Sequence, residues 1–255
     1  MKSLFDIGGK VAVVTGGSRG IGAMIARGFV ENGVKTYITA RNEEELQTTA
    51  SELSAPGECI AIAADLSTLE GLTGFANAIS AREKKVHILV NNAGATWGAA
   101  IDQFPESGWD KVMDLNVKSV FFLTQKLLPV LRAARGPEDP ARVINVGSVS
   151  DYMHTTMENY SYSASKSAVH MLTRHLGADL AGENINVNGI APGYFPSKMT
   201  AHLLDHEEEM TQAIPRRRLG TAEDAAGVAI YLSARASSYV IGQIIVVDGG
   251  MVAAS

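Results

Sequence analysis

Short apolar runs alternate with longer helical patterns along the whole of this chain. Seven runs have the length and aliphatic character of buried strands, and they cover residues 10–15, 35–40, 60–64, 86–90, 142–146, 185–190 and 243–247. Helical spacing of apolar residues is found at 21–32, 43–53, 72–82, 107–117, 120–132, 160–181 and 222–233. Strands that are apolar on both faces and alternate with helices build parallel sheets. The pattern predicts an α/β fold, a doubly wound parallel sheet of about seven strands with helices on both faces.

No linker, repeat or low-complexity tract interrupts this pattern over the 255 residues, so we expect a single domain spanning residues 1–255. The stretch 194–218 is the exception to the regular alternation, because it lacks a clean period and contains Pro196 and Pro215. Irregular insertions of this length in a compact domain are often binding loops. We therefore expect residues 194–218 to form a substrate lid, with solvated charges at 206–209 and 216–218.

Composition and charge exclude several classes of function. Lys and Arg total 22 against 27 Asp and Glu, and this mildly acidic balance argues against partners such as nucleic acid or an anionic membrane. The single cysteine excludes a disulfide framework, and the six histidines show no metal-ligand spacing, so we expect no metal site. No apolar run approaches the roughly 20 residues of a membrane span, and the first residues lack a signal-peptide core. We expect a cytoplasmic protein.

A glycine-rich turn joins the first predicted strand to the first predicted helix, with the spacing Gly16-x-x-x-Gly20-x-Gly22. Glycines let the backbone turn sharply and bring N–H groups close to a phosphate, at the positive end of the new helix. The position predicts a dinucleotide site of the Rossmann type, although the spacing differs from G-x-G-x-x-G. The alternative is a tight structural turn. The expected cofactor contacts here are Gly16, Ser18, Arg19, Gly20, Ile21 and Gly22.

The end of the second strand indicates which dinucleotide is bound. Sites for NAD usually place an Asp or Glu there, about 20 residues after the turn, to hold the ribose 2′-hydroxyl. This chain has Ala40 followed by Arg41, and Arg19 lies within the glycine turn. Guanidinium groups pair with a 2′-phosphate, which a carboxylate would repel. Two arginines and no acid favour NADPH or NADP+. The alternative is that both arginines are surface residues that bind no ligand.

The predicted helix 160–181 carries Tyr162 and Lys166, four residues apart and therefore on one face, with Cβ atoms about 5–6 Å apart. A free tyrosine has a pKa of about 10, and a neighbouring ammonium would lower that pKa by stabilising the phenolate. Tyr152 and Tyr160 have no lysine at this spacing. A Tyr-x-x-x-Lys pattern is common by chance, so alone it could be a surface feature.

Further motifs follow one another in the order typical of the short-chain dehydrogenase/reductase family. They are Thr15–Gly22, Asn91–Gly94, Asn116, Ser148, Tyr162 with Lys166, Pro192–Gly193 and Asp248–Gly250. On these motifs the chain resembles the single-domain members of the family over essentially its whole length. The resemblance implies a Rossmann-type dinucleotide-binding and catalytic domain that transfers hydride between NADP(H) and a ketone or alcohol. It also implies a homotetramer, with the long helices and the C-terminal strand at the interfaces.

The resemblance also implies four catalytic residues. Tyr162 would be the general acid that protonates the carbonyl oxygen, and Ser148 would hydrogen-bond that oxygen. Lys166 would lower the pKa of Tyr162 and hold the nicotinamide ribose. Asn116 would position a water that links Lys166 to solvent. Ser150 is the rival to Ser148, but the family's serine aligns with Ser148, just past a central strand where α/β sheets bind ligands.

Other cofactor contacts are carried over on the same basis. Asp65 and Leu66 follow the third strand and would contact the adenine. The remaining matching positions, expected to line the cofactor and its nicotinamide, are Asn92, Ala93, Gly94, Pro192, Gly193, Phe195 and Ser197. Family members often have a smaller aliphatic residue and a threonine where this chain has Phe195 and Ser197.

The substrate is less constrained. The segments 91–100, 107–113, 139–142 and 192–200 resemble β-ketoacyl reductases of the family, which implies a 3-oxoacyl thioester or a similar small-molecule ketone. Sugar-acid and polyol dehydrogenases of the gluconate 5-dehydrogenase type share the Pro-Gly-Tyr-Phe run and form the alternative. A catalytically idle NADP(H)-binding protein is a third reading. The side chains that either form the substrate pocket or pack the lid are Trp97, Tyr152, Met153, His154, Tyr194 and Met199.

Overall fold

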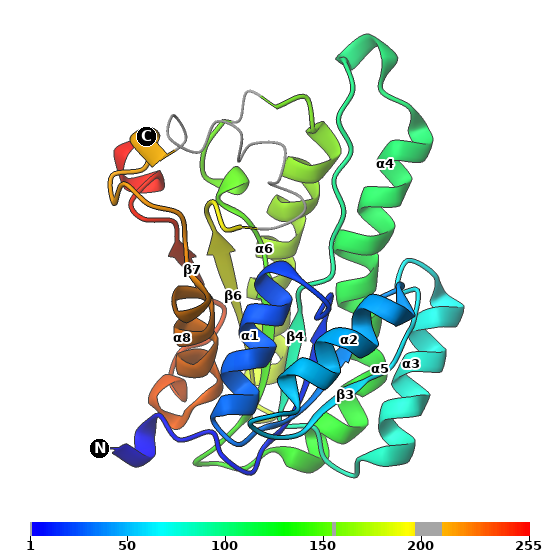
Figure 1. The fold of residues 1–255 in the computed structure, drawn as a ribbon, viewed down its shortest axis with the longest axis vertical. Coiled ribbons are helices and arrows are strands. Elements are labelled where there is room, and N and C mark those ends of the chain that lie inside the picture. Colours follow the sequence, from blue (N-terminus) through cyan, green and yellow to red (C-terminus); the bar gives the residue numbers. More distant parts are fainter. Residues whose placement is uncertain (1, 155–156, 197–210) are drawn as a thin grey trace.

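The computed structural model describes residues 2–154, 157–196 and 211–255. Seven strands form one sheet in the order β3-β2-β1-β4-β5-β6-β7, and every neighbouring pair is parallel. The strands are β1 (Val11–Thr15), β2 (Lys35–Thr39), β3 (Cys59–Ala61), β4 (Ile88–Asn91), β5 (Ala141–Val146), β6 (Ile185–Pro192) and β7 (Ile244–Val247). Figure 1 shows the strands surrounded by helices. The predicted parallel α/β sheet is confirmed.

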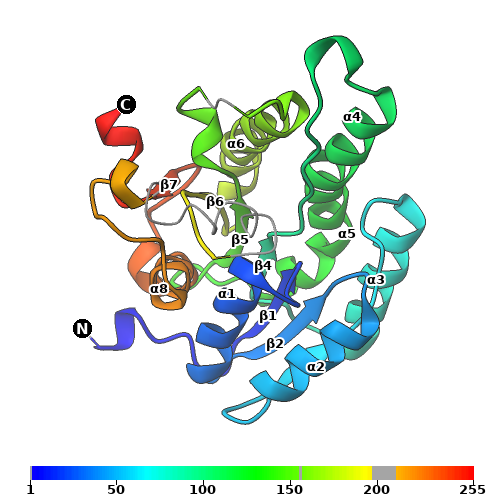
Figure 2. The same cartoon turned by 45° about the horizontal axis from the view of Figure 1, so that its top comes forward.

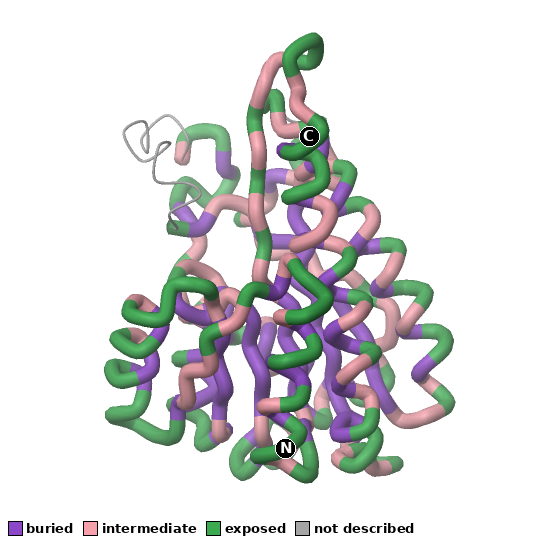
Figure 3. The backbone as a smooth tube through the Cα atoms, turned by 90° about the vertical axis from the view of Figure 1, so that its right-hand side faces the viewer, coloured by how far each residue is buried: buried purple, intermediate pink, exposed green. Residues whose placement is uncertain are grey.

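Helices cover both faces of the sheet (Figure 2). They are α1 (Gly20–Glu31), α2 (Glu43–Leu53), α3 (Leu69–Arg82), α4 (Glu106–Met113), α5 (Ser119–Ala134), α6 (Tyr160–Ala181) and α8 (Ala222–Ser233). One apolar cluster unites the sheet with α1, α2 and α8, and a second unites it with α3, α5 and α6. The strands run through the buried centre, as the burial colours in Figure 3 show. In the described residues no helix is long and apolar enough to span a bilayer.

Two regions differ from the prediction by more than small shifts of their ends. Residues 107–132 were expected to contain two separate helices, but α4 and α5 form one continuous helical run, joined by the π-helical turn Asp114–Lys118. Short π-helical insertions often occur at functional sites because they re-aim single side chains. Strand β3 covers three residues rather than the five predicted at 60–64, and in the part of the chain that the structure describes its one neighbour is β2.

The strand order creates a crevice at one end of the sheet. The chain moves outward from β1 to β2 and β3, then returns to the other side of β1 through β4. At such a switch point the loops after neighbouring strands diverge, and ligands of doubly wound proteins bind between them. The loop after β4 and helix α4 extend beyond this end of the sheet (Figure 1). The fold therefore places the segments after β1, β2, β4, β5 and β6 around one opening.

Candidate active site

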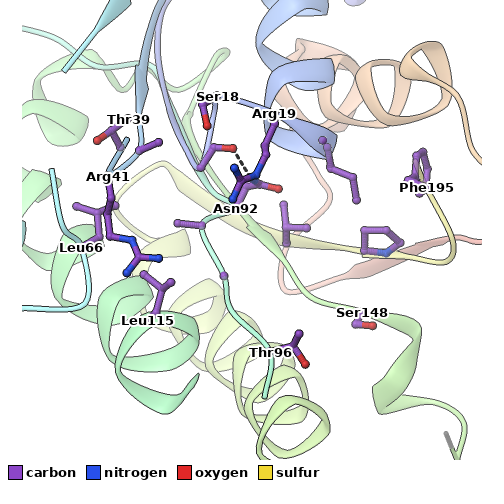
Figure 4. A pocket seen from close by; sticks show the side chains of 18 of the residues that line it. Ser18, Arg19, Thr39, Arg41, Leu66, Asn92, Thr96, Leu115, Ser148 and Phe195 are labelled. Atoms are coloured by element: carbon purple, nitrogen blue, oxygen red, sulfur yellow. Dashed lines mark hydrogen bonds between the residues drawn. The ribbon is translucent and has the colours of Figure 1, made fainter. Parts of the chain in front are cut away.

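A cavity of about 620 Å³ opens at the carboxyl ends of these strands. Its size lies within the roughly 300–1,000 Å³ typical of small-molecule sites. Arg41, Leu66 and Leu115 gather at one end of it, and Ser148 and Phe195 lie at the other (Figure 4). The predicted residues that line it are Gly16, Ser18, Arg19, Gly20, Ile21, Arg41, Leu66, Asn92, Ala93, Gly94, Ser148, Tyr162, Lys166, Pro192, Gly193 and Phe195. The structure therefore brings most of the predicted site into one place.

The glycine turn is packed closely against the loop after β4. Gly16 has φ +64, a backbone conformation that favours glycine, and a Cβ there would lie 2.9 Å from the side-chain amide of Asn92. That amide donates hydrogen bonds to the carbonyls of Thr15 and Gly16, at 2.9 and 3.2 Å. Gly22 does not line the cavity, since a Cβ there would lie 2.2 Å from the Gly16 carbonyl oxygen. Gly22 therefore supports the turn by close packing from behind.

An acidic side chain lies at the arginine end of the cavity. The Glu45 carboxylate, in the first turn of α2, accepts hydrogen bonds from the Arg19 guanidinium at 2.9 and 3.0 Å. The Ser18 hydroxyl lies 3.5 Å from the same carboxylate. The sequence reasoning considered only the residues directly after β2, where no acid stands, and did not predict that Glu45 of α2 lies beside Arg19. Glu45 comes four residues after Arg41, and its place in the first turn after β2 was the signal that could have revealed it.

Thr39, the last residue of β2, was also missed by the sequence reasoning. Its hydroxyl oxygen is fully buried and has no hydrogen-bond partner among the described residues, yet the residue lines the cavity. A buried polar group in that condition marks a place where a ligand atom could bind. The other lining residues that were not predicted as contacts are Ala40, Asn42, Ala64, Thr96, Leu115, Val146 and Gly147. Ala40 and Gly147 stand directly after a strand and Val146 ends one, which is the signal that could have identified these three.

Helix α6 presents Tyr162 and Lys166 to the cavity opposite Ser148. The Lys166 ammonium donates to the Val146 carbonyl at 2.8 Å and lies 5.5 Å from the centroid of the Tyr162 ring. Burial lowers the pKa of Lys166 to about 8. Burial raises the pKa of Tyr162, and a hydrogen bond with Ser148 opposes that rise without cancelling it. This is the opposite of the predicted lowering, because loss of water around the phenol outweighs its neighbours.

Asn116 lies in the π-helical turn and is 1% exposed, so it does not line the cavity itself. Its side-chain oxygen accepts from the Ala95 N–H at 2.8 Å, and its amide donates to the Ala95 carbonyl at 3.0 Å and the Ser165 hydroxyl at 2.9 Å. A Cβ on Gly94 would lie 3.3 Å from the Asn116 oxygen and 3.7 Å from the Lys166 ammonium. Asn116 and Lys166 therefore flank the same glycine, and the water-positioning role stays a prediction.

The structure places Asp65 and Phe195, two further predicted cofactor contacts, in different surroundings. Asp65 is exposed and does not line the cavity, because its carboxylate accepts hydrogen bonds from the N–H and hydroxyl of Ser67 at 3.0 and 2.7 Å. Its predicted adenine contact stays a prediction. Phe195 is 3% exposed and forms part of the cavity wall. Ser197 and Met199 lie outside the described residues.

Five of the side chains considered for the substrate pocket can be placed, and none of them lines this cavity. Trp97 packs on Gly108 of α4, with the Lys111 ammonium 5.0 Å from its ring centroid. Met153 and Tyr194 pack against a small apolar cluster. The members of that cluster are Ile214, Leu219 and Met251. Trp97, Met153 and Tyr194 therefore pack against neighbouring segments and not against this cavity.

Comparison with known proteins gives consistent matches over the whole chain. The family model described as short chain dehydrogenase matches residues 10–208. The rhamnolipids biosynthesis 3-oxoacyl-[acyl-carrier-protein] reductase of Pseudomonas aeruginosa is 48% identical over 253 residues, 98% of this chain and 99% of that protein. Gluconate 5-dehydrogenase of Gluconobacter oxydans is 34% identical over 97% of this chain and 96% of its own.

Solved structures agree with these relatives. The Pseudomonas aeruginosa RhlG/NADP active-site complex superposes with a TM-score of 0.95 at 48% identity, covering 99% of this chain and 100% of that one. A gluconate 5-dehydrogenase from Burkholderia cenocepacia, in complex with NADP and tartrate, gives a TM-score of 0.90 at 32% identity and covers 99% of each chain. At these identities the likeness extends beyond the fold to the sequence that builds it.

Proposed function

The chain belongs to the short-chain dehydrogenase family, and from that premise we propose that it is an NADPH-dependent carbonyl reductase acting on a 3-oxoacyl thioester. The observation that carries the proposal is the group of Ser148, Tyr162 and Lys166 on the wall of one cavity that also holds Arg41. A proton donor and a cationic anchor for a phosphate are the two features that such a reaction needs from the protein. The relative named for 3-oxoacyl reduction, at 48% identity, supports the substrate class.

The residues of the cavity fit a phosphorylated dinucleotide. The backbone N–H groups of the glycine turn lie at the N-terminus of α1. This end of the helix carries a partial positive charge and favours a pyrophosphate. The Arg41 guanidinium lies at the adjoining end, where a ribose carrying a 2′-phosphate would be held. When bound, NADPH supplies the hydride for the carbonyl carbon. Lys166 and Pro192 also line the cavity and would border the nicotinamide end.

The protein's own contribution to the reaction is a proton and its placement. The raised pKa of Tyr162 keeps its phenol protonated at neutral pH, so it can donate to the carbonyl oxygen. Ser148 shares a hydrogen bond with that phenol and would donate a second one to the same oxygen. Lys166, with a pKa of about 8, can hold or release a proton near neutral pH. Its ammonium therefore forms the next site from which Tyr162 regains a proton.

The lid and the assembly are part of the same proposal. Within 194–218, Phe195 forms part of the cavity wall, and this supports a role for the stretch in covering substrate. Strand β7 has β6 as its single neighbour in the described sheet, and its four residues are all partly exposed. That edge supports a homotetramer in which β7 lies at an interface, and a cytoplasmic location is proposed with it. The measurement is light scattering in solution. A particle mass equal to that of one chain would contradict the tetramer.

A sugar-acid dehydrogenase is the second candidate, favoured by the gluconate 5-dehydrogenases among the similar sequences and structures. An idle dinucleotide-binding protein is disfavoured, because Tyr162 and Lys166 are both present and both reach the cavity.

The deciding experiment follows the loss of NADPH absorbance with acetoacetyl-CoA and 5-ketogluconate in parallel, and repeats both assays with NADH. Turnover of the thioester with NADPH is the expected result. Turnover of the sugar acid alone would move the assignment to the second candidate. Tight NADP+ binding without turnover of any ketone in a broad panel would contradict the reductase proposal.

A further inference from the structure

A buried imidazole and a partly buried carboxylate form a pair between helix α6 and the turn that follows Ser148. The His170 Nδ1 atom lies 2.7 Å from the Asp151 carboxylate, and the His170 side chain is 0% exposed. His170 follows Lys166 by four residues and Tyr162 by eight. Residues at that spacing project from the same face of a helix. The imidazole therefore lies on the same face of α6 as Tyr162, the proposed proton donor.

Asp151 belongs to the same short turn as Ser148. Ser148 precedes the 3-10 turn Val149–Asp151, and its hydroxyl oxygen accepts from the Ser150 N–H at 3.1 Å. The Ser148 and Ser150 hydroxyls are also 3.1 Å apart. Asp151 is the last residue of this turn. The bond from Asp151 to His170 thus ties the end of the serine turn to the helix that carries Tyr162.

We propose that Asp151 and His170 are positioning residues, which hold Ser148 at hydrogen-bonding distance from the Tyr162 phenol. This inference rests on the proposed reductase function and adds to it the means by which two separate segments are kept in register. A displacement of about 1 Å at a reacting group can cost about 100-fold in rate, so a rigid tie between the two segments has a direct effect on turnover.

The surroundings of His170 favour one fixed arrangement over exchange of protons. Its Nε2 atom has no hydrogen-bond partner among the described residues, and a Cβ on Gly147 would lie 1.9 Å from it. The ring is therefore enclosed against the backbone that leads to Ser148. The Tyr152 ring covers it, with centroids 5.5 Å apart. With Nε2 enclosed, His170 does not itself reach the reacting atoms.

The charges around the pair agree with a neutral imidazole that donates from Nδ1. Burial lowers the pKa of His170, with Lys166 and Arg174 acting in the same direction and Asp151 opposing them. Burial raises the pKa of Asp151, but hydrogen bonds from Ser167 and His170 and the charge of Arg174 outweigh that effect, so its pKa lies below the usual value. At neutral pH, a carboxylate therefore accepts from a neutral N–H, and the pair stays intact.

The test compares Asp151→Ala and Asp151→Asn with Asp179→Ala, a matched control that removes an exposed Asp–His pair on the same helix. Turnover of the accepted ketone, its KM, and the Kd of NADP+ are measured for each. We expect Asp151→Ala to lower kcat about tenfold or more with the NADP+ Kd changed by less than about twofold. Asp151→Asn, whose amide oxygen still accepts from Nδ1, should retain more of the activity. The control should match wild type.

A second readout needs no substrate, so it separates this inference from the proposed function. The absorbance titration of wild type minus that of Tyr162→Phe isolates one phenol among the seven tyrosines. Loss of the Ser148 hydrogen bond should raise the pKa of Tyr162 in Asp151→Ala, since that bond lowers it. His170→Phe, which keeps an aromatic ring but removes Nδ1, should give the same shift if Asp151→Ala folds poorly. An unchanged phenol titration in the folded variants, or equal losses of turnover and NADP+ affinity, would overturn the positioning role.

Discussion

Arg19, Arg41 and Glu45 contribute charges at the end of the cavity that we propose for the 2′-phosphate. Arg19 is already engaged by Glu45, whereas Arg41 lies at the same end after β2. A phosphate that approaches Arg19 must therefore compete with a carboxylate. Exposed ion pairs of this kind contribute at most about 1 kcal/mol, so the competition weakens binding without abolishing it.

Replacing Glu45 with Gln should therefore tighten NADP+ binding by about two- to fivefold, a change within the energy of one exposed pair. NAD+ lacks the phosphate and should change little. Glu44→Gln, an exposed residue in the same helical turn, is the matched control. Isothermal titration with both dinucleotides gives the answer. Weaker NADP+ binding in Glu45→Gln would show that Glu45 holds Arg19 in the binding position rather than competing for it.

Arg41 is expected to select between the two dinucleotides more strongly. Arg41→Asp replaces a guanidinium that can pair with the 2′-phosphate by a carboxylate that repels it. NADPH affinity should fall by at least about tenfold more than NADH affinity, since charge-assisted pairs are worth about 1.5–3 kcal/mol. Fluorescence titration of the two reduced cofactors measures the difference. Equal losses of affinity for NADPH and NADH would show that Arg41 does not bind the 2′-phosphate.

The packing of whole elements depends on small residues where helices meet. Gly28 of α1 faces Ala226 of α8, and a Cβ on Gly28 would lie 2.4 Å from the Ala226 Cβ. The close approach lets both helices cover the same face of the sheet. Gly74 of α3 is different, because no atom lies within 4 Å of the Cβ that it lacks.

The two glycines should respond oppositely to alanine. Gly28→Ala should lower the free energy of unfolding by about 1–3 kcal/mol, because overpacking forces α1 and α8 apart. Gly74→Ala should raise it by about 0.5–1 kcal/mol, because alanine favours the helix and meets no neighbour. Urea unfolding of both variants measures the changes. An increase in both would mean that the helix contact between α1 and α8 is not a close one.

Element boundaries show what local sequence can and cannot determine. Helix α6 was predicted with its observed bounds, and the strands were found because their apolar runs are short and separated by helical periods. The π-helical turn that holds Asn116 was not predicted, since one extra residue in a helical turn leaves no clear mark on apolar spacing. Glu45 and Thr39 were missed because their place in the cavity depends on how α2 and β2 pack against the glycine turn.

At the scale of the whole molecule, acid should destabilise the fold in two stages. Burial lowers the pKa of His170 below the usual 6.5, so the unfolded chain binds more protons and stability falls as the pH drops below about 6.5. The hydrogen bond from Arg218 lowers the pKa of Asp224 to about 2, so its contribution is present above about pH 4 and lost as the pH falls toward 2.

Thermal unfolding between pH 8 and pH 3 measures these two stages. Tm should fall first as the pH drops below about 6.5, and His170→Phe should remove part of that first decrease, because a phenyl ring does not titrate while His87, whose pKa burial also lowers, still does. Asp224→Asn should reduce the second decrease only. A profile of His170→Phe parallel to wild type would show that the buried imidazole does not control the first stage.

The central claim is that Tyr162 donates the proton to a ketone in a cavity that holds NADPH. Tyr162→Phe removes the hydroxyl and keeps the ring, so the most direct measurement is its NADPH-dependent turnover of acetoacetyl-CoA, alongside its Kd for NADP+. We predict that kcat falls by about 100-fold or more while the Kd changes by less than about twofold. Turnover close to wild type, with NADP+ still bound, would contradict the role of Tyr162 as the proton donor.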